Sequence, residues 1–405
     1  RRGAYGSRMQ QASSPAVVLP DPGRSQPILV GITTALVGFT SSFAVVLAGL
    51  RAVGASLAQA TTGLIVLCAV IGLATLWLST RHRLPITLAW STPGAAVLVA
   101  AGAVDGGWPA AVGAFLVVGL LLVATAVVPG LGRLVQAIPA PVAHAMLAGV
   151  LLTICLQTVT ALVSIPLVVG PVVVLWLLLV RYAPRWSTPI AFAVALAIAA
   201  GLAVAEGRGL AVQAPTFSPT IPSFSVTALV GVAIPLWVVT VASQHVPGVA
   251  VMGSFGHRVP WKETLVVTGA GTLFGAAGGA HAINLAAITA ALPASEESHP
   301  DAKRRWIAAH TAGWTYLVLA LLVPVMTGLA ADAPPGLLEA IAGLALLGTL
   351  GASLASAMEV PSRRIPAVTA FLVAASGVVV AGIGSTFWGL IAGLLVWWVL
   401  APRKA

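Results

Sequence analysis

The stretch Pro85-Ile86-Thr87-Leu88-Ala89-Trp90-Ser91-Thr92-Pro93-Gly94 interrupts a segment that is otherwise apolar enough to cross a membrane. Thr92 is a good N-cap and Pro93 suits the first position of a helix, so we expect a helix to begin here and to end near Ala103. The residues before Thr92 are expected to be extended. This pattern places the start of a helix in the middle of the membrane.

A second interrupted segment, Gly278-Gly279-Ala280-His281-Ala282-Ile283-Asn284, repeats the pattern late in the chain. Asn284 is a good N-cap for a helix from Leu285 to Leu292. Each helix N-terminus has unpaired N–H groups and about half a positive charge. Two such ends facing each other near the midplane would bind an anion without a basic side chain. The alternative is a pair of kinked spans that bind nothing.

The composition around these breaks is that of an integral membrane protein. Hydrophobic residues make up 59% of the 405 residues and charged residues 7%, which is too few charges to cover a soluble domain of this length. The fold class we predict is an all-α polytopic membrane protein with fourteen transmembrane spans. They are 28–50, 57–79, 86–103, 110–128, 141–163, 167–182, 188–205, 225–247, 263–278, 280–293, 306–329, 336–358, 365–383 and 385–400.

The net charge of +10 indicates orientation. All lysines and arginines except Arg51 and Arg208 lie at the termini or in every second gap between spans, and basic residues stay on the cytoplasmic side during insertion. Both termini are therefore expected to be cytoplasmic. The basic residues are too scattered for a nucleic-acid surface.

The spans divide into two groups of seven. Because seven is odd, the second group must enter the membrane from the opposite side to the first. The sequence thus predicts an inverted repeat, the common build of secondary transporters. Residues 1–27 are expected to form a disordered cytoplasmic tail, and 206–224 an external linker. No nucleotide loop, metal cluster or nucleophile–base pattern occurs in the sequence, so we expect neither a cofactor nor enzymatic activity.

No acidic or basic residue is predicted near the midplane, which leaves histidine as the protonatable side chain. His281 lies beside the second break, and an ionisable residue at that depth is a functional candidate. A bound anion would favour its protonation, so anion and proton would bind together; the alternative is a neutral histidine that caps broken backbone. His144 and His310 are more simply interfacial, and His245 is open between a structural and a functional role.

Polar and aromatic residues in two further spans are candidates for contact with a ligand. Phe39-Thr40-Ser41-Ser42-Phe43 places hydroxyls and two phenyl rings near the centre of the first span, where ordinary helix packing is the alternative. Trp237 is central in the eighth span. Helix counting alone places Gln244 towards the inner side.

Three segments resemble the benzoate/proton symporter family of bacteria: Val37-Gly38-Phe39-Thr40-Ser41-Ser42-Phe43-Ala44, Leu88 to Ala95, and Gly279 to Thr289. The resemblance covers the chain from about residue 26. More distantly, the chain is similar to uracil and xanthine permeases and to sulfate/bicarbonate carriers. This resemblance implies short strands before the half-helices of spans 3 and 10.

The resemblance also implies two domains. A core domain would comprise 28–128 and 225–329, and a gate domain 129–205 and 330–405. Nucleobase permeases carry a glutamate where Gln244 stands, in Gln244-His245-Val246-Pro247, and another where His281 stands. Both departures suit an anionic ligand, and they favour Gln244 as a site residue.

The sequence therefore predicts a bacterial inner-membrane carrier that imports benzoate or a related aromatic carboxylate with a proton, by an elevator motion of core against gate. The alternatives are a nucleobase or other small-anion carrier and, from another class, an anion channel or scaffold. Expected partners are the anion, the proton, membrane lipid and, as an option, a second copy in a homodimer. His281 would carry the proton. The expected substrate-binding residues are Phe39, Ser41, Ser42, Phe43, Trp90, Ser91, Thr92, Gly94, Trp237, Gln244, Ala282 and Asn284.

Overall fold

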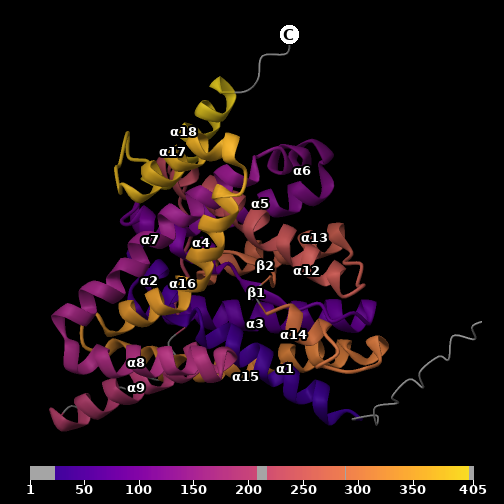
Figure 1. Cartoon of the computed structure of the whole chain (residues 1–405), viewed down its shortest axis with the longest axis vertical. Coiled ribbons are helices and arrows are strands. Elements are labelled where there is room, and N and C mark those ends of the chain that lie inside the picture. The colour runs from indigo at the N-terminus through magenta and orange to yellow at the C-terminus, as the bar shows by residue number, and fades with distance from the viewer. Residues whose placement is uncertain (1–22, 208–216, 288, 401–405) are drawn as a thin grey trace, which may run out of the picture.

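The computed structural model describes residues 23–207, 217–287 and 289–400, apart from the side chain of Gln136. Residues 1–22 of the predicted tail and 208–216 of the predicted linker lie outside this part of the chain. Helices surround one short two-stranded sheet, which lies near the centre of the molecule (Figure 1).

The first half of the chain contains nine α-helices, one strand and a 3-10 turn within the described residues. In order they are α1 (Ser25–Thr40), α2 (Phe43–Ala52), α3 (Leu57–His82), β1 (Leu88–Trp90), α4 (Thr92–Ala101), α5 (Gly107–Val127), α6 (Pro129–Gln136), α7 (Ala140–Ser164), α8 (Pro166–Tyr182), η1 (Pro184–Trp186) and α9 (Ser187–Ala205).

The second half begins with one long helix that contains two π-helical segments, and it ends with two helices near the C-terminus. Its elements are α10 (Val226–Ala228), η2 (Leu229–Ala233), α11 (Ile234–Thr240), η3 (Val241–His245), α12 (Val246–Ser254), α13 (Trp261–Gly275), η4 (Ala276–Gly278), β2 (Ile283–Leu285), α14 (Ala291–Ala294), η5 (Ala302–Arg304), α15 (Trp306–Ala331), α16 (Leu337–Met358), η6 (Pro361–Arg363), α17 (Arg364–Ala375) and α18 (Ser385–Val399).

The sheet pairs β1 and β2 antiparallel, with Ala89 opposite Asn284. Its outer edges face helices, where an unpaired N–H group would be costly because no water is available. A threonine hydroxyl accepts a hydrogen bond at each edge: the Leu88 N–H donates to Thr75 Oγ1 of α3 (3.2 Å), and the Ile283 N–H donates to Thr272 Oγ1 of α13 (3.0 Å). Non-helical backbone is thereby satisfied inside the helical bundle.

Helix α4 follows β1, as the sequence predicts, but its cap differs by one residue. Ser91 is the N-cap, and its Oγ accepts a hydrogen bond from the Gly94 N–H (3.1 Å). Thr92, predicted as the cap, is the first helical residue. Serine is a somewhat better N-cap than threonine, and the strand pairing also favours Ser91 because its N–H donates to the Ala282 carbonyl (3.0 Å).

The helix predicted from Leu285 to Leu292 is wrong. Asn284 lies within β2 and does not cap a helix, and the next described helix is α14, which is only four residues long. Sheet pairing extends past β2 through a bond from the Ala286 N–H to the Thr87 carbonyl (3.0 Å). The strand pairing therefore reaches Ala286, where the apolar pattern predicted a helix.

Three other spans differ from their predicted form. The first is broken at Ser41 and Ser42, between α1 and α2. The eighth continues to Ser254 and contains two π-helical segments, η2 and η3. The thirteenth was predicted over 365–383, yet α17 ends at Ala375 and is followed by a loop.

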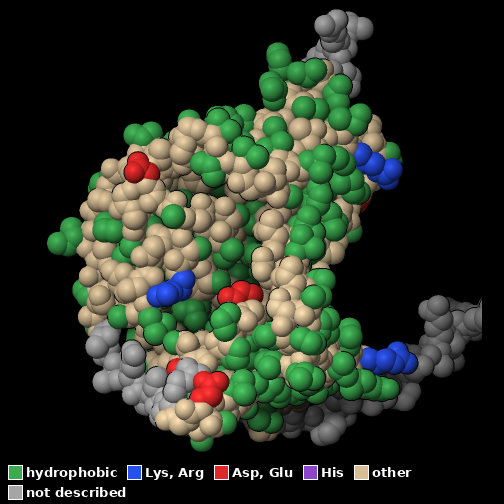
Figure 2. Space-filling view, turned by 90° about the vertical axis from the view of Figure 1, so that its left-hand side faces the viewer, with side chains coloured by type: hydrophobic (Ala, Val, Ile, Leu, Met, Phe, Trp, Pro, Cys, Tyr) green, Lys and Arg blue, Asp and Glu red, His purple; other side chains and the backbone are tan. Residues whose placement is uncertain are grey.

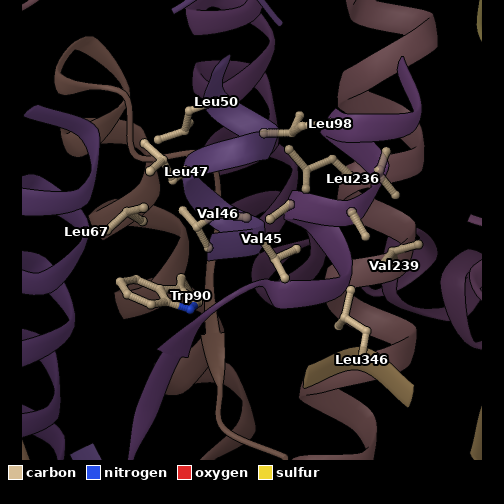
Figure 3. Packing of buried hydrophobic residues seen from close by; sticks show 14 of the residues in the cluster. Val45, Val46, Leu47, Leu50, Leu67, Trp90, Leu98, Leu236, Val239 and Leu346 are labelled. Carbon is tan, nitrogen blue, oxygen red and sulfur yellow. The ribbon is translucent and has the colours of Figure 1, made fainter. Parts of the chain in front are cut away.

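The helices pack in pairs that join the two halves of the chain. α3 packs on α15, α5 on α13 and α7 on α16, while α8 packs on α9 and α17 on α18. Apolar side chains of α2, α4 and α11 interlock between these pairs, among them Val46, Leu98 and Leu236 (Figure 3). Such packing fixes α4 against its neighbours.

The outer surface is that of a membrane protein. Among the helices of the described residues, eight are long and apolar enough to cross a membrane, and three shorter apolar ones are α4, α8 and α18. Figure 2 shows a face covered largely by hydrophobic side chains, with few charged ones. Three contacts link segments that the charge pattern predicts to lie on the same side of the membrane. They are Arg81–Glu263 (2.8 Å), Arg185–Glu297 (2.8 Å) and Arg83 over the Trp306 ring (4.1 Å).

Candidate functional site

A cavity of about 440 Å³ lies between two groups of helices at the start of α4. The break between α1 and α2, the first turn of α4, the segment η3 and the residue Ala287 form one wall, while α7 and α16 form the other. The lining residues are Ser41, Ser42, Thr92, His144, Leu147, Ser243, Gln244, Pro247, Ala287, Ala345, Leu346, Gly348, Thr349, Ala352, Ser353 and Ser356.

The α4 N-terminus brings a free backbone donor to this cavity. Ser91 Oγ accepts from both the Gly94 N–H and the Thr240 hydroxyl (2.9 Å), so its hydroxyl oxygen is occupied. Thr92 lines the cavity, and neither its N–H nor its hydroxyl has a partner among the described residues. A helix N-terminus with unpaired donors favours an anion.

Gln244 reaches the cavity because η3 is wound as a π-helix. Pro247 follows the segment, and a proline ring in a regular helix clashes with the carbonyl four residues earlier, here that of Ser243. A π-turn relieves this clash, as η2 does before Pro235, and π-turns are frequent at functional sites. The Gln244 amide, 6% exposed, has no hydrogen-bond partner in the described chain.

The break in the first span places two hydroxyls on the same wall. The Ser41 and Ser42 hydroxyls both donate to the Gly38 carbonyl (3.3 and 3.0 Å), which satisfies the backbone at the break. Ser42 Oγ also accepts from Trp90 Nε1 (2.7 Å). Ser42 therefore connects the broken helix to β1, and both of its hydrogen-bonding roles are already taken within the protein.

The wall formed by α7 and α16 was missed in the sequence. Hydroxyls of Thr349, Ser353 and Ser356 recur at helical spacing along α16, and His144 projects from α7. The spacing of four and three residues places the hydroxyls on one face. That pattern was the available signal, although small polar residues on a transmembrane helix are equally common in helix packing.

Three predicted ring-binding residues form an aromatic cluster outside the cavity lining. Phe39 lies 5.4 Å from both Phe43 and Trp90, measured between ring centroids, and all three are buried. Trp237 points elsewhere, since its Nε1 donates to Thr125 Oγ1 of α5 (3.0 Å). The apolar part of the cavity lining comes instead from residues such as Leu147 and Leu346.

The predicted residues around the second break lie behind the cavity. His281 Nε2 donates to the Ser91 carbonyl (3.0 Å), its Nδ1 has no partner among the described residues, and the ring meets Phe115 edge-on. Asn284 is buried and donates to the Leu285 carbonyl (2.9 Å). Ala282 serves through its backbone in the sheet. A proton-coupling role for His281 stays a prediction.

Gly94 permits close packing and also lies outside the lining. A Cβ at this position would lie 2.3 Å from Leu236 Cδ1 and 2.7 Å from Ser91 Oγ. His245, the neighbour of Gln244, likewise faces away from the cavity: its Nδ1 accepts from the Leu285 N–H (3.5 Å), and its Nε2 is 3.4 Å from Thr268 Oγ1. Of the adjacent pair, Gln244 therefore faces the cavity.

The described walls of the site carry no permanently charged side chain. The lining, as far as the chain is described, contains no aspartate, glutamate, lysine or arginine, and His144 is its one ionisable residue. A search of the described residues finds no group that could hold a metal ion. Its chemistry is that of hydrogen bonds and apolar contact, which suits reversible binding of a small molecule.

A membrane-embedded helical bundle with a polar cavity beside broken helices defines a membrane transporter. The model of the benzoate membrane transport protein family matches residues 23–399, and the chain belongs to this family. It is 38% identical to the inner membrane protein YdcO of Escherichia coli strain K12, over 92% of this chain and 95% of that protein. It is 29% identical to a benzoate membrane transport protein of Acinetobacter baylyi, over 82% and 84% of the two chains.

Solved structures show the same fold at low sequence identity. The transmembrane domain of a cyanobacterial bicarbonate transporter, BicA, aligns with a TM-score of 0.59 at 17% identity, over 91% of this chain and 97% of that one. SLC26A9 aligns with a TM-score of 0.63 at 13% identity, over 93% of this chain and 64% of that one. Members of the family are membrane transporters and not enzymes.

Proposed function

We propose that this protein is a secondary-active carrier that imports benzoate, or a closely related aromatic carboxylate, together with a proton across a bacterial inner membrane. The observation that carries the proposal is the cavity at the α4 N-terminus, where the free Thr92 donors and the Gln244 amide line one wall and no acidic side chain is present in the described lining. The name of the Acinetobacter relative indicates the substrate, and that of the Escherichia coli relative indicates the membrane.

The carboxylate would bind at the polar end of the cavity. The Thr92 N–H and hydroxyl and the Gln244 amide would donate to its oxygens, and hydrogen bonds to a charged acceptor are about twice as strong as neutral ones. The phenyl ring would lie against Leu147, Pro247 and Leu346. The cavity volume of about 440 Å³ is within the range of small-molecule sites.

The proposed architecture is fourteen spans in two inverted repeats of seven. In such a repeat the second span, α3, corresponds to the ninth, α13, and the fourth, α5, corresponds to the eleventh, α15. The packed pair α3 and α15 then corresponds to the packed pair α13 and α5. In the same way, the pair α8 and α9 corresponds to the pair α17 and α18. The sheet edges follow the same exchange, since Thr75 of α3 and Thr272 of α13 have equivalent roles. These correspondences support the repeat.

Transport would occur by an elevator motion of a core domain, residues 28–128 and 225–329, against a gate domain, 129–205 and 330–405. The cavity lies between helices of these two parts. Two further cavities, of about 300 and 250 Å³, lie along the same interface and share Ala48 and Glu339, near the start of α16. The first cavity extends instead to Ser356, near the end of α16 that the charge pattern assigns to the cytoplasm. We infer an inward-facing state.

Uptake of labelled benzoate into proteoliposomes tests the proposal directly. We expect accumulation when the outside is more acidic than the lumen, and slower equilibration without a gradient. No uptake under either condition would reject benzoate transport, and uptake that ignores the gradient would reject symport. Saturable uptake separates a carrier from a channel, while competition by uracil tests the nucleobase alternative. A homodimer stays a prediction.

A further inference from the structure

We propose that His144, on the gate side of the cavity, is the group that takes up the transported proton and pairs with the substrate carboxylate. This inference rests on the proposed benzoate carrier. His144 lies in α7 and is half-buried, and it is the single ionisable side chain among the lining residues that the structure describes. It faces the same space as Thr92 and Gln244, from the opposite wall.

Polar groups of α16 line the same cavity as His144. Ser353 and Ser356 line the cavity, and neither hydroxyl has a partner in the described chain. They can hydrogen-bond an imidazole or a carboxylate in either protonation state, since a hydroxyl both donates and accepts. Protonation of His144 therefore adds a positive charge to a wall that already offers hydrogen bonds.

One charged side chain acts directly on His144. Glu359, at the C-terminal end of α16, is exposed and interacts with it electrostatically. Glu339 is at the far end of the same helix, where its carboxylate accepts from the Gly336 N–H (3.0 Å). Glu359 thus places a negative charge near His144, at the end of the cavity that points to the predicted cytoplasmic side.

The other elements packed on α7 contribute no competing charge to the cavity. α4, α11 and α18 carry no titratable residue. Arg364 of α17 donates to the Met358 carbonyl (3.0 Å), and Arg181 of α8 lies over the Tyr182 ring (5.9 Å). His245 of η3 is bonded to the backbone of β2. None of these side chains lines the cavity.

His281, the candidate from the sequence, is placed differently. It is fully buried behind the α4 N-terminus, with Nε2 bonded to the Ser91 carbonyl and the ring against Phe115. A proton taken up there would not meet the carboxylate across open space. His144 can exchange its proton with the cavity, so the proton would enter with the anion and leave with it when the carrier faces inward.

Binding of benzoate to purified protein between pH 6 and pH 8 tests the assignment, because the ligand stays ionised in this range. For one coupled proton, the wild-type Kd should rise by about tenfold per pH unit above the pKa of the site. His144→Gln should remove this dependence, while His310→Gln, on the α15 surface, should keep it. A His144→Gln protein with the wild-type pH dependence would overturn the inference, as would loss of the dependence in His281→Gln alone. A wild-type protein that does not bind benzoate would instead reject the proposed function.

Chemical modification of the unaltered protein provides a second test, which does not depend on the folding of a variant. Diethylpyrocarbonate should modify His144 through the open cavity, and saturating benzoate should slow that reaction. His245 and His281 should react little in either condition. Equal modification of His144 with and without benzoate, measured by mass spectrometry of its peptide, would show that the ligand does not cover it and would overturn the inference.

Discussion

Replacing Gln244 with glutamate is the sharpest test of how the cavity selects an anion. Glutamate has nearly the same size and shape, so the change introduces a charge with little effect on packing. The Gln244 side chain lines the cavity and has no partner in the described residues. A carboxylate bound to the free Thr92 N–H would share the cavity with this side chain, and we propose that it accepts a hydrogen bond from it. Gln244→Glu therefore replaces a donor with a second carboxylate.

The magnitude follows from Coulomb's law. Two unit negative charges about 5 Å apart, at an effective dielectric constant of about 20, repel by about 3 kcal/mol. The lost hydrogen bond to a charged acceptor adds about 1.5–3 kcal/mol. Repulsion alone corresponds to roughly 150-fold weaker binding of benzoate, and both effects together would abolish measurable binding. A neutral analogue such as benzamide should be affected much less.

Isothermal titration calorimetry at pH 7.5 on detergent-purified protein would measure the effect. Gln157→Glu is the matched control, because Gln157 lies on α7 and lines a separate cavity of about 250 Å³. It introduces the same charge into the same molecule and should leave the Kd of benzoate unchanged. Wild-type affinity in Gln244→Glu would refute our reasoning, since it would mean that the carboxylate does not bind beside Gln244. Equal losses in both variants would indicate a general charge effect.

Three further substitutions test the framework around the site. Gly94→Val should destabilise the fold by about 1–3 kcal/mol and slow uptake, because its Cβ would lie 2.3 Å from Leu236 Cδ1; a wild-type Tm would contradict this. Thr75→Val should cost about 1–3 kcal/mol, because the Leu88 N–H loses its acceptor, while Thr75→Ser should restore the Tm. Burial lowers the pKa of His257 in the α12–α13 loop, so the unfolded state binds the proton more tightly and stability should fall as the pH drops below about 6.5. His257→Gln should flatten that pH dependence of the Tm.

The first break could be predicted because its signals are local. Proline and glycine after Ser91 and Thr92 specify a helix start whatever surrounds them, and β1 and α4 lie where this pattern predicts. The helix predicted after the second break is wrong because the deciding contacts are not local. Residues 285–292 are apolar and uninterrupted, so the pattern favours a helix. Strand pairing, as in the bond from Ala286 to Thr87, is a contact between distant segments that no local pattern records.

The contrast between local signals and distant contacts also explains which residues of the candidate site could be predicted. Thr92 and Gln244 were predicted, one by capping and the other through the resemblance, and both line the cavity. The sequence favours an interfacial role for His144, because a lone histidine near a helix end carries no local signal of a binding site. The position of His144 in the cavity depends on how α7 packs against α16, which is a contact between distant segments of the chain. Trp237 is the opposite case, a predicted site residue that does not line the cavity. It is central in its span, yet its indole N–H donates to Thr125 Oγ1.

An anion site inside a membrane needs donors that stay fixed when the ligand is absent, since a flexible donor would find another acceptor. The α4 N-terminus is fixed in this way because Ser91 bonds to Ala282 through its N–H, to Gly94 and Thr240 through its hydroxyl, and to His281 through its carbonyl. His281 therefore has a structural explanation that requires no proton transfer. With this wall held in place and neutral, the group that changes charge would lie on the opposite wall of the cavity, where His144 is. We therefore assign the proton to His144 and the fixed donors to α4.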